Sequence, residues 1–142
     1  MSRLFLDSSV LFSAAYSTRG HAHDLIRMAI RRELTAVVSP LVLTETRRNL
    51  ADNAPEHLIL LDYVLQNVPF EIVQPTRREV VAATKYAALK DAPIVAAARR
   101  ARVDFLVTLD KKHLLGRPEL AKYSRAEIVT PKEAVIRLTR MN

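Results

Sequence analysis

Four acidic side chains are the residues of this chain whose type and spacing best support chemistry. They are Asp7, Glu45, Asp91 and Asp110. Carboxylates gathered at one place repel one another unless a cation joins them, and the hard ions Mg²⁺ and Mn²⁺ prefer carboxylate oxygens. Such an ion lowers the pKa of bound water and offsets charge on a phosphoryl oxygen. If the fold brings the acids together, the chemistry indicated is metal-dependent hydrolysis of phosphodiester bonds.

The elements that must position these acids are short apolar runs separated by longer stretches of helical period. This alternation is typical of a parallel sheet with crossover helices on both faces. We therefore predict a three-layer α/β/α domain over residues 1–142, with a mostly parallel five-stranded sheet. The predicted strands are Arg3–Leu6, Thr35–Val38, Phe70–Val73, Asp104–Val107 and Ala126–Val129.

Capping residues mark where the helices should begin. Ser39-Pro40 predicts one start, and Asp91-Ala92-Pro93 predicts another. Thr76–Glu79 and Thr130–Glu133 have the pattern of capping boxes, in which the Glu reaches back to the amide of the cap residue. The helices predicted from these starts follow the strands, as crossover connections require.

Two of the acids stand at the carboxyl ends of predicted strands, where ligands bind in open α/β sheets. Asp7 directly follows Leu4-Phe5-Leu6, and Asp110 follows the fourth predicted strand after two further residues. An unpaired charge beside an apolar strand is unfavourable. We therefore favour a functional role for both residues.

The other two acids each have an ordinary structural explanation. Asp91 could simply cap the helix that follows it, since Asp is a favoured capping residue. Glu45, about one and a half turns into the helix opened by Pro40, could be a solvated residue paired with Arg48 or Asn49. A functional role for Asp91 and Glu45 therefore requires that both lie near the same edge of the sheet as Asp7.

Polar residues beside the two strand ends are candidates for support or substrate binding. Ser9 and Thr108 could hydrogen-bond a carboxylate, a metal-bound water or a phosphate oxygen, or could cap a turn instead. Lys111 and Lys112 follow Asp110 directly and are placed to meet a phosphate.

The formal net charge is +7, and it is concentrated late in the chain. Residues 99–142 hold 11 basic and 5 acidic residues, against 11 and 10 in the preceding part. This asymmetry favours a polyanionic partner and makes nucleic acid a better substrate than a metabolite. The cluster Arg99, Arg100 and Arg102 closes a predicted helix, where cations suit the negative helix end, so we expect it to face away from the acids.

Composition excludes several other classes of protein. The absence of cysteine rules out thiol catalysis, zinc–thiolate sites and disulfides, and it agrees with a reducing cytoplasmic location. Two glycines are too few for a nucleotide-binding loop of the Rossmann or P-loop type. No apolar run is long enough to span a membrane, and the start lacks the pattern of a signal peptide.

Three segments, LFLDSSVLFSA, LVLTETRRNL and KDAPIVAAARRARVDFLVTLDKKHL, resemble the PIN-domain family of metal-dependent ribonucleases. Asp7, Glu45, Asp91 and Asp110 match the four acids of the family pattern. The resemblance implies strand order 3-2-1-4-5, Mg²⁺ or Mn²⁺ in an acidic cleft, and endonuclease action on RNA. It also implies a toxin similar to VapC proteins, with an antitoxin protein as partner and a homodimeric state.

The sequence departs from the family pattern at two places. Ser9 stands where many members have Asn, and Lys112-His113 replaces a further acid found in some members. Both departures leave the four-acid set intact, and they bear on how many metal ions are bound.

Three rival interpretations differ in their requirements. A haloacid-dehalogenase-like phosphatase needs a second Asp two residues after the first, where this chain has Ser9. A signalling receiver needs an Asp closing the third strand, where this chain has Val73-Gln74. A non-catalytic, basic RNA- or partner-binding domain of the same fold remains the alternative, and binding without cleavage would favour it.

Overall fold

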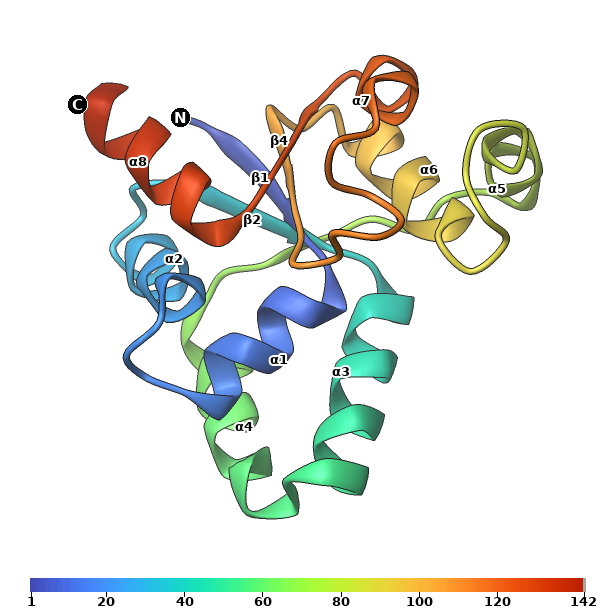
Figure 1. The fold of residues 1–142 in the computed structure, drawn as a ribbon. Helices are drawn as coiled ribbons and strands as arrows, with labels where there is room; N and C mark the ends of the chain where they lie inside the picture. The colour runs from blue at the N-terminus through green and yellow to red at the C-terminus, as the bar shows by residue number, and fades with distance from the viewer. Residues whose placement is uncertain (142) are drawn as a thin grey trace.

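A computed structural model describes residues 1–141 and shows a five-stranded, all-parallel sheet with helices on both faces (Figure 1). The strands lie in the order β3-β2-β1-β4-β5. Their bounds are Arg3–Leu6 for β1, Thr35–Val38 for β2, Glu71–Ile72 for β3, Phe105–Val107 for β4 and Glu127–Val129 for β5. The predicted three-layer α/β fold and the strand order implied by the resemblance are both confirmed.

The helices of the described chain alternate with these strands in pairs or singly. Their bounds are Ser8–Tyr16 for α1, His21–Ile30 for α2, Pro40–Asn53 for α3, Leu58–Asn67 for α4, Arg77–Ala83 for α5, Ala92–Ala101 for α6, Pro118–Ser124 for α7 and Pro131–Met141 for α8, with a 3₁₀ turn, η1, at Pro55–His57. None of them is long and apolar enough to cross a membrane.

Helix packing divides into two groups, one on each face of the sheet. Helix α1 packs on α2, α3 and α4, and α2 packs on α8, whereas α6 packs on α5 and α7. Figure 1 shows α5, α6 and α7 gathered on one side, away from α1, α2 and α4. The change of side occurs because β3 connects to β4 across the sheet, and a right-handed crossover in that direction places its helices on the opposite face.

The core is the three central strands and the apolar helix faces against them. Leu4, Phe5, Leu6 and Leu106 are fully buried. Burial on both faces explains why these strands are continuous apolar runs rather than alternating ones.

Three of the five predicted strands are slightly longer than the observed ones. Strand β3 is Glu71–Ile72 rather than Phe70–Val73, and β4 and β5 each begin one residue later than predicted. At the start of β4 the carboxylate of Asp104 accepts from the amide of Arg3 at 2.8 Å, while its backbone still bonds to Arg3 and Glu127. The central strands β1 and β2 have the predicted bounds.

The predicted capping boxes are present. The Thr76 hydroxyl accepts from the amide of Glu79 at 3.1 Å, and the Glu79 carboxylate accepts from the amide of Thr76 at 2.8 Å. Thr130 and Glu133 make the same reciprocal pair, at 3.1 Å in both directions. Ser39 caps α3 through the amide of Val42.

The carboxyl ends of β1 and β4 form the point at which strand order reverses. Strand β1 connects to β2 on one side, whereas the chain reaches β4 on the other side only after β3. In open α/β sheets this crevice is where ligands bind. Asp7 follows β1 there, and Asp110 follows β4.

Candidate metal and catalytic site

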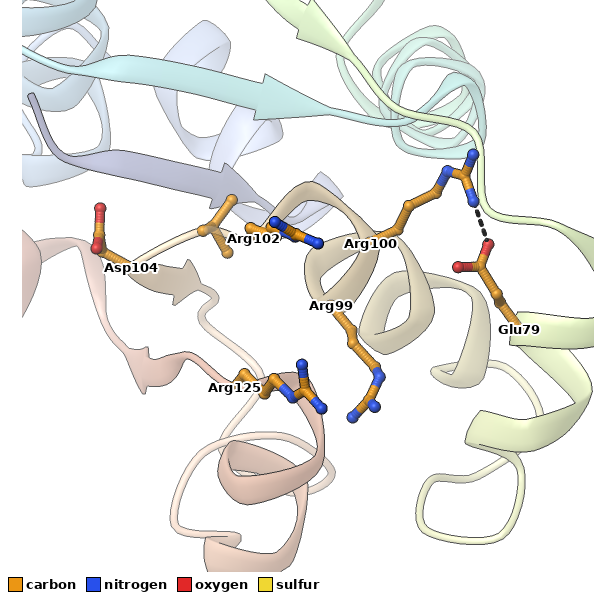
Figure 2. Close-up of a pocket in the computed structure, with 7 residues that line it drawn as sticks. Glu79, Arg99, Arg100, Arg102, Asp104 and Arg125 are labelled. Carbon is orange, nitrogen blue, oxygen red and sulfur yellow. Dashed lines mark hydrogen bonds and ion pairs between the residues drawn. The ribbon is translucent and has the colours of Figure 1, made fainter.

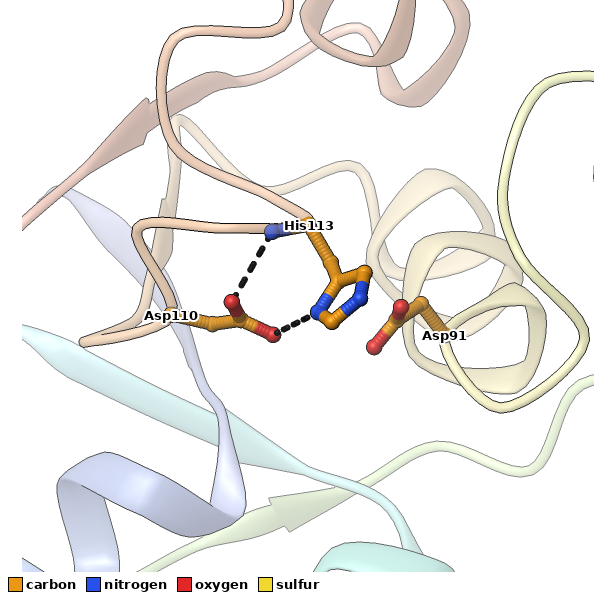
Figure 3. A group of neighbouring side chains, drawn as sticks. All are labelled: Asp91, Asp110 and His113. Carbon is orange, nitrogen blue, oxygen red and sulfur yellow. Dashed lines mark hydrogen bonds and ion pairs between the residues drawn. The ribbon is translucent and has the colours of Figure 1, made fainter.

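Three side chains lie close enough together to hold one metal ion. Asp91, Asp110 and His113 each offer a ligand atom, and these atoms all lie within 4.8 Å of one another. Figure 3 shows Asp91, from the start of α6, facing Asp110 and His113, which come from the turn after β4. The group combines carboxylate oxygen with imidazole nitrogen, a donor set that suits Mn²⁺ and other first-row divalent ions.

Asp91 is the member of this group without an internal partner. The residue is 8% exposed, and its Oδ2 is buried with no hydrogen bond to any other atom of residues 1–141. Burial raises the pKa of the Asp91 carboxyl, and the charge of Asp110 adds to the effect while Lys90 opposes it. A buried oxygen left unsatisfied is unfavourable unless an ion or water completes it.

The structure does not support helix capping as the role of the Asp91 side chain. The residue occupies the N-cap position of α6, yet its side chain makes no capping hydrogen bond. The reason is its backbone, which is already helical at φ −97 and ψ −18, whereas a capping side chain needs an extended backbone at that position. The carboxylate is consequently free to face Asp110.

Asp110 is held firmly by the turn that follows it. Its Oδ1 accepts from the amides of Lys112 at 3.0 Å and His113 at 2.9 Å, and its Oδ2 lies 3.3 Å from Nδ1 of His113. Burial alone would raise the pKa of this carboxyl, but the two backbone amides and His113 outweigh it and the pKa is lowered. Asp110 therefore carries negative charge more readily than Asp91.

Asp7 is buried behind this pair and accepts three hydrogen bonds. The donors are the amide of Ser8 at 2.7 Å, the hydroxyl of Thr108 at 2.8 Å and the hydroxyl of Ser9 at 3.3 Å. Burial nevertheless raises the pKa of Asp7, with a smaller contribution from the charge of Asp110. The carboxylate is thus fixed in place by donors, at an electrostatic penalty that a nearby cation would relieve.

Ser9 and Thr108 tie the ends of β1 and β4 together. The Thr108 hydroxyl donates to Asp7 and accepts from the amide of Asp110 at 3.1 Å. The Ser9 hydroxyl donates to Asp7 and accepts from the amide of Leu109 at 3.1 Å. Both hydroxyls are bonded to the carboxylate network, which was one of the possibilities raised by the sequence.

Glu45 lies at the same edge but is only partly buried. Burial raises its pKa, and the charges of Asp7 and Asp91 contribute, which places all three carboxylates within electrostatic reach of one another. Glu45 has no hydrogen bond or ion pair within residues 1–141, so the predicted alternative of pairing with Arg48 or Asn49 is not observed. The charge of Arg48 does lower the pKa of Glu45 in opposition to burial.

Within residues 1–141, the side chains of the remaining predicted residues make no hydrogen bond or ion pair with this group. Lys111 and Lys112 are exposed in the turn after Asp110, and only the backbone amide of Lys112 contacts the carboxylate. Arg99, Arg100 and Arg102 lie at the far end of α6, beside the amino end of β4, as the sequence predicted.

His113 is a candidate metal ligand that the sequence did not predict. It was noted only as a replacement for an acid, although the structure places its imidazole beside two carboxylates. The signal was the spacing Asp110-x-x-His113 directly after a strand, because a tight turn returns the fourth residue to the first.

Comparison with protein families identifies the class. The model of the PIN domain family matches residues 3–112. This match covers most of the chain and all four acids, so the chain belongs to the PIN domain family. A comparison with curated proteins gives no match.

Solved structures with the same fold include proteins of low sequence identity. PAE2754 from Pyrobaculum aerophilum is 19% identical, with a TM-score of 0.69 over 98% of both chains. VapBC2 from Rickettsia felis, bound to a DNA fragment from its promoter, is 13% identical, with a TM-score of 0.64 over 90% of this chain and 98% of that one. FitAB bound to the IR36 DNA fragment is 14% identical, with a TM-score of 0.57 over 90% and 94%.

Proposed function

We propose that this protein is a Mg²⁺- or Mn²⁺-dependent endoribonuclease that hydrolyses RNA phosphodiester bonds. The observation that carries the proposal is the Asp91 carboxylate, which lies beside Asp110 and His113 and has a buried Oδ2 with no hydrogen-bond partner within residues 1–141. The family supports it, since PIN domains are generally nucleases and typically use divalent metals. The basic surplus of the last third supports a polyanionic substrate.

Each acid has a distinct part in this proposal. Asp7, Asp91 and Asp110 would hold the principal cation, with His113 as a further ligand, and Glu45 would share it or orient the attacking water. When bound, the ion lowers the pKa of a coordinated water and offsets charge on the phosphoryl oxygen. Glu45 is suited to accepting a proton, because it is partly exposed and its pKa is raised by burial and by Asp7.

The residues around the acids position them or meet the substrate. Thr108 and Ser9 fix the carboxylate of Asp7 through their hydroxyls. Lys111 and Lys112 are exposed beside Asp110 and supply positive charge for the phosphate on either side of the cut.

His113 favours Mn²⁺ over Mg²⁺ in this site. Imidazole nitrogen binds Mn²⁺ readily, whereas Mg²⁺ prefers an all-oxygen shell. If Nδ1 of His113 donates to Asp110, its Nε2 is left as the acceptor that can serve as a ligand. Calorimetric titration should show that His113→Ala weakens Mn²⁺ binding more than Mg²⁺ binding, and an equal loss for both ions would remove His113 from the ligand set.

The biological role that we propose is the toxin of a toxin–antitoxin pair. The protein would act in the cytoplasm as a single domain spanning residues 1–142, form a homodimer and be inhibited by an antitoxin protein. The support is the resemblance to VapC-type toxins, together with the shared fold of VapBC2 and FitAB. A monomeric mass by light scattering would remove the homodimer from this proposal.

The test is cleavage of a mixed pool of structured RNA by the purified protein, with Mn²⁺, Mg²⁺ or a chelator. Asp91→Asn is the decisive variant, because the side chain makes no capping bond that the substitution could disturb. Asp52→Asn is the matched control, since Asp52 is exposed on the same type of element and lies outside the group of four acids. All three proteins are prepared identically, so that a contaminating nuclease would appear in each.

We expect metal-dependent cleavage by the wild type and by Asp52→Asn, and a loss of roughly 100-fold or more in Asp91→Asn, beyond the loss typical of removing an outer-shell partner. Cleavage that survives in Asp91→Asn would contradict the assignment. RNA binding without cleavage or metal binding in the wild type would favour the non-catalytic, RNA-binding alternative.

A further inference from the structure

A second charged feature lies at the opposite end of the sheet from the carboxylates. A hollow of about 900 Å³ is lined by four arginines and two acids, namely Arg99, Arg100, Arg102, Arg125, Glu79 and Asp104, together with Val103. Figure 2 shows Arg99 and Arg125 extending toward the same space, with Arg102 above them. The charges in this hollow are predominantly positive.

Two of these arginines already have internal partners. Arg100 donates to the carboxylate of Glu79 at 2.9 Å. Arg99 donates to the carbonyl of Tyr123 at 2.6 Å and lies 4.5 Å from the centre of the Tyr123 ring. Arg99 keeps guanidinium N–H groups beyond this bond, so it is a fixed donor at the wall of the hollow.

The other two arginines have no partner within residues 1–141. Arg102 and Arg125 are exposed, and no hydrogen bond or ion pair joins either side chain to another residue drawn in Figure 2. The carboxylate of Asp104 is turned away from them and accepts from the amide of Arg3. Positive charge in the hollow is therefore left unneutralised by the fold.

Both free arginines also occupy backbone positions that suit glycine better. Arg102 ends α6 at φ 54, and Arg125 ends α7 at φ 59, in the left-handed region. A side chain costs about 1–2 kcal/mol there. Arg32 has the same backbone conformation, at φ 62, but does not line the hollow. A left-handed arginine is therefore not by itself a sign of this hollow.

An adjoining hollow adds aromatic surface to this cationic wall. It measures about 420 Å³ and shares Arg99 and Arg125 with the first. Its wall includes Tyr86 and Tyr123, whose rings stack with centroids 4.7 Å apart, and Tyr86 is 43% exposed. An exposed ring beside a cationic groove is the arrangement used to bind single-stranded nucleic acid, with bases stacked and phosphates held.

We propose that these two hollows form a second RNA-binding surface, which holds phosphates on Arg102 and Arg125 and stacks a base on Tyr86. A nucleotide offers both a phosphate for the planar guanidinium fork and a base for the ring, whereas an acidic peptide offers only carboxylates. Arg102, at the end of the ten-residue helix α6, lies roughly 15 Å from Asp91 at its start. The surface would anchor the RNA at a distance from the cleavage site. This part of the inference rests on the proposed RNA substrate.

The test measures RNA binding without cleavage. A mixed-sequence single-stranded RNA oligonucleotide is titrated with the protein in chelator, at several salt concentrations. The variants are Arg102→Gly, Arg125→Gly, the double variant and Tyr86→Ala. Arg32→Gly is the matched control, because it removes one exposed arginine from the same left-handed conformation at another site.

We expect each hollow arginine removed to lower the slope of log affinity against log salt by about 0.7, and the double variant to bind about tenfold more weakly. Tyr86→Ala should weaken binding without changing the slope, and Arg32→Gly should leave both unchanged. Equal losses in Arg32→Gly and the hollow variants would overturn the proposal, as would no loss in the double variant.

Two further outcomes separate this surface from the proposed nuclease. If the wild type cleaves no RNA but binds it through Arg102 and Arg125, the surface stands and the nuclease proposal falls. If the wild type binds no RNA, or if polyglutamate binds through these arginines and RNA does not, the surface is not an RNA site.

Discussion

At the carboxyl ends of β1 and β4, carboxylates converge and one of them is buried without a partner within residues 1–141. At the amino ends, five arginines gather and three of them have partners. Arg3 at the start of β1 is bonded to Glu71 at 2.7 and 3.0 Å, and Arg100 is bonded to Glu79. Asp91 has no such compensation within the described residues.

The difference between the two ends of the sheet shows which charged groups find partners within the protein and which do not. Cations at the amino ends follow helix C-termini, where the helix dipole favours them, and neighbouring acids complete several of them. At the other end, burial raises the pKa of Asp7, Glu45 and Asp91, and the charges of neighbouring carboxylates add to the effect. Groups that break local rules without compensation in this way are typical of functional sites.

The largest expected effect at the carboxylate end is stabilisation of the folded protein by a bound metal ion. At a concentration 100 times its dissociation constant, Mn²⁺ should raise the free energy of unfolding of the wild type by about 2.7 kcal/mol. Asp91→Asn should lose most of this gain, because it removes the unpartnered buried oxygen. Urea denaturation with Mn²⁺ or chelator measures it, and a full gain in the variant would place the ion elsewhere.

Asp7→Asn should destabilise the protein in chelator by about 1 kcal/mol, because an amide group cannot accept from all of the donors that hold the carboxylate and relief of the buried charge offsets only part of that loss. Because the same carboxylate is proposed to hold the metal, the substitution should lower the activity far more than the stability. Denaturant midpoints of the variant and of Asp52→Asn provide the comparison. A variant as stable as the wild type would mean that Thr108 and Ser9 rearrange without loss.

Asp91→Asn should stabilise the metal-free protein, on the order of 1 kcal/mol at neutral pH, and the gain should depend on pH. Burial raises the pKa of Asp91 above its unfolded value. Below the unfolded pKa both states are protonated and the carboxyl incurs no penalty, whereas above the folded pKa both are ionised and the full penalty applies. The stability gained by Asp91→Asn over the wild type should therefore appear as the pH rises from the unfolded to the folded pKa of Asp91, and it should vanish in acid. Unfolding curves recorded with chelator at several pH values measure it.

The sequence was sufficient to predict the fold because its local signals agree with one another. The apolar runs at β1 and β2, the capping pairs at Thr76 and Thr130, and the proline at position 93 each indicate the element that forms there. The short edge strand β3 was less well predicted, since its two residues are exposed and carry little apolar pattern.

Of the candidate site, the acids and the neighbouring hydroxyls of Ser9 and Thr108 could be named from the sequence. A carboxylate after an apolar strand stands out in a sequence, whereas the partners of Asp110 depend on how tightly its turn closes. The absence of a capping bond at Asp91 depends on its backbone angles, which Asp-x-Pro does not specify. The convergence of Arg102 and Arg125 requires two helices distant in sequence to end side by side.

The smallest expected effects distinguish a held arginine from a free one. Arg102→Gly should leave the free energy of unfolding unchanged or raise it by up to about 1 kcal/mol, because relief of the left-handed backbone is partly offset by the entropy of glycine. Arg99→Ala should lower it by about 1 kcal/mol, since it loses the bond to the Tyr123 carbonyl and the contact with the ring. Urea denaturation of both variants gives the sign of each change. A clear loss in Arg102→Gly would show that its side chain has a structural partner, and the arginines at this end of the sheet would then be satisfied by the fold rather than left for a ligand.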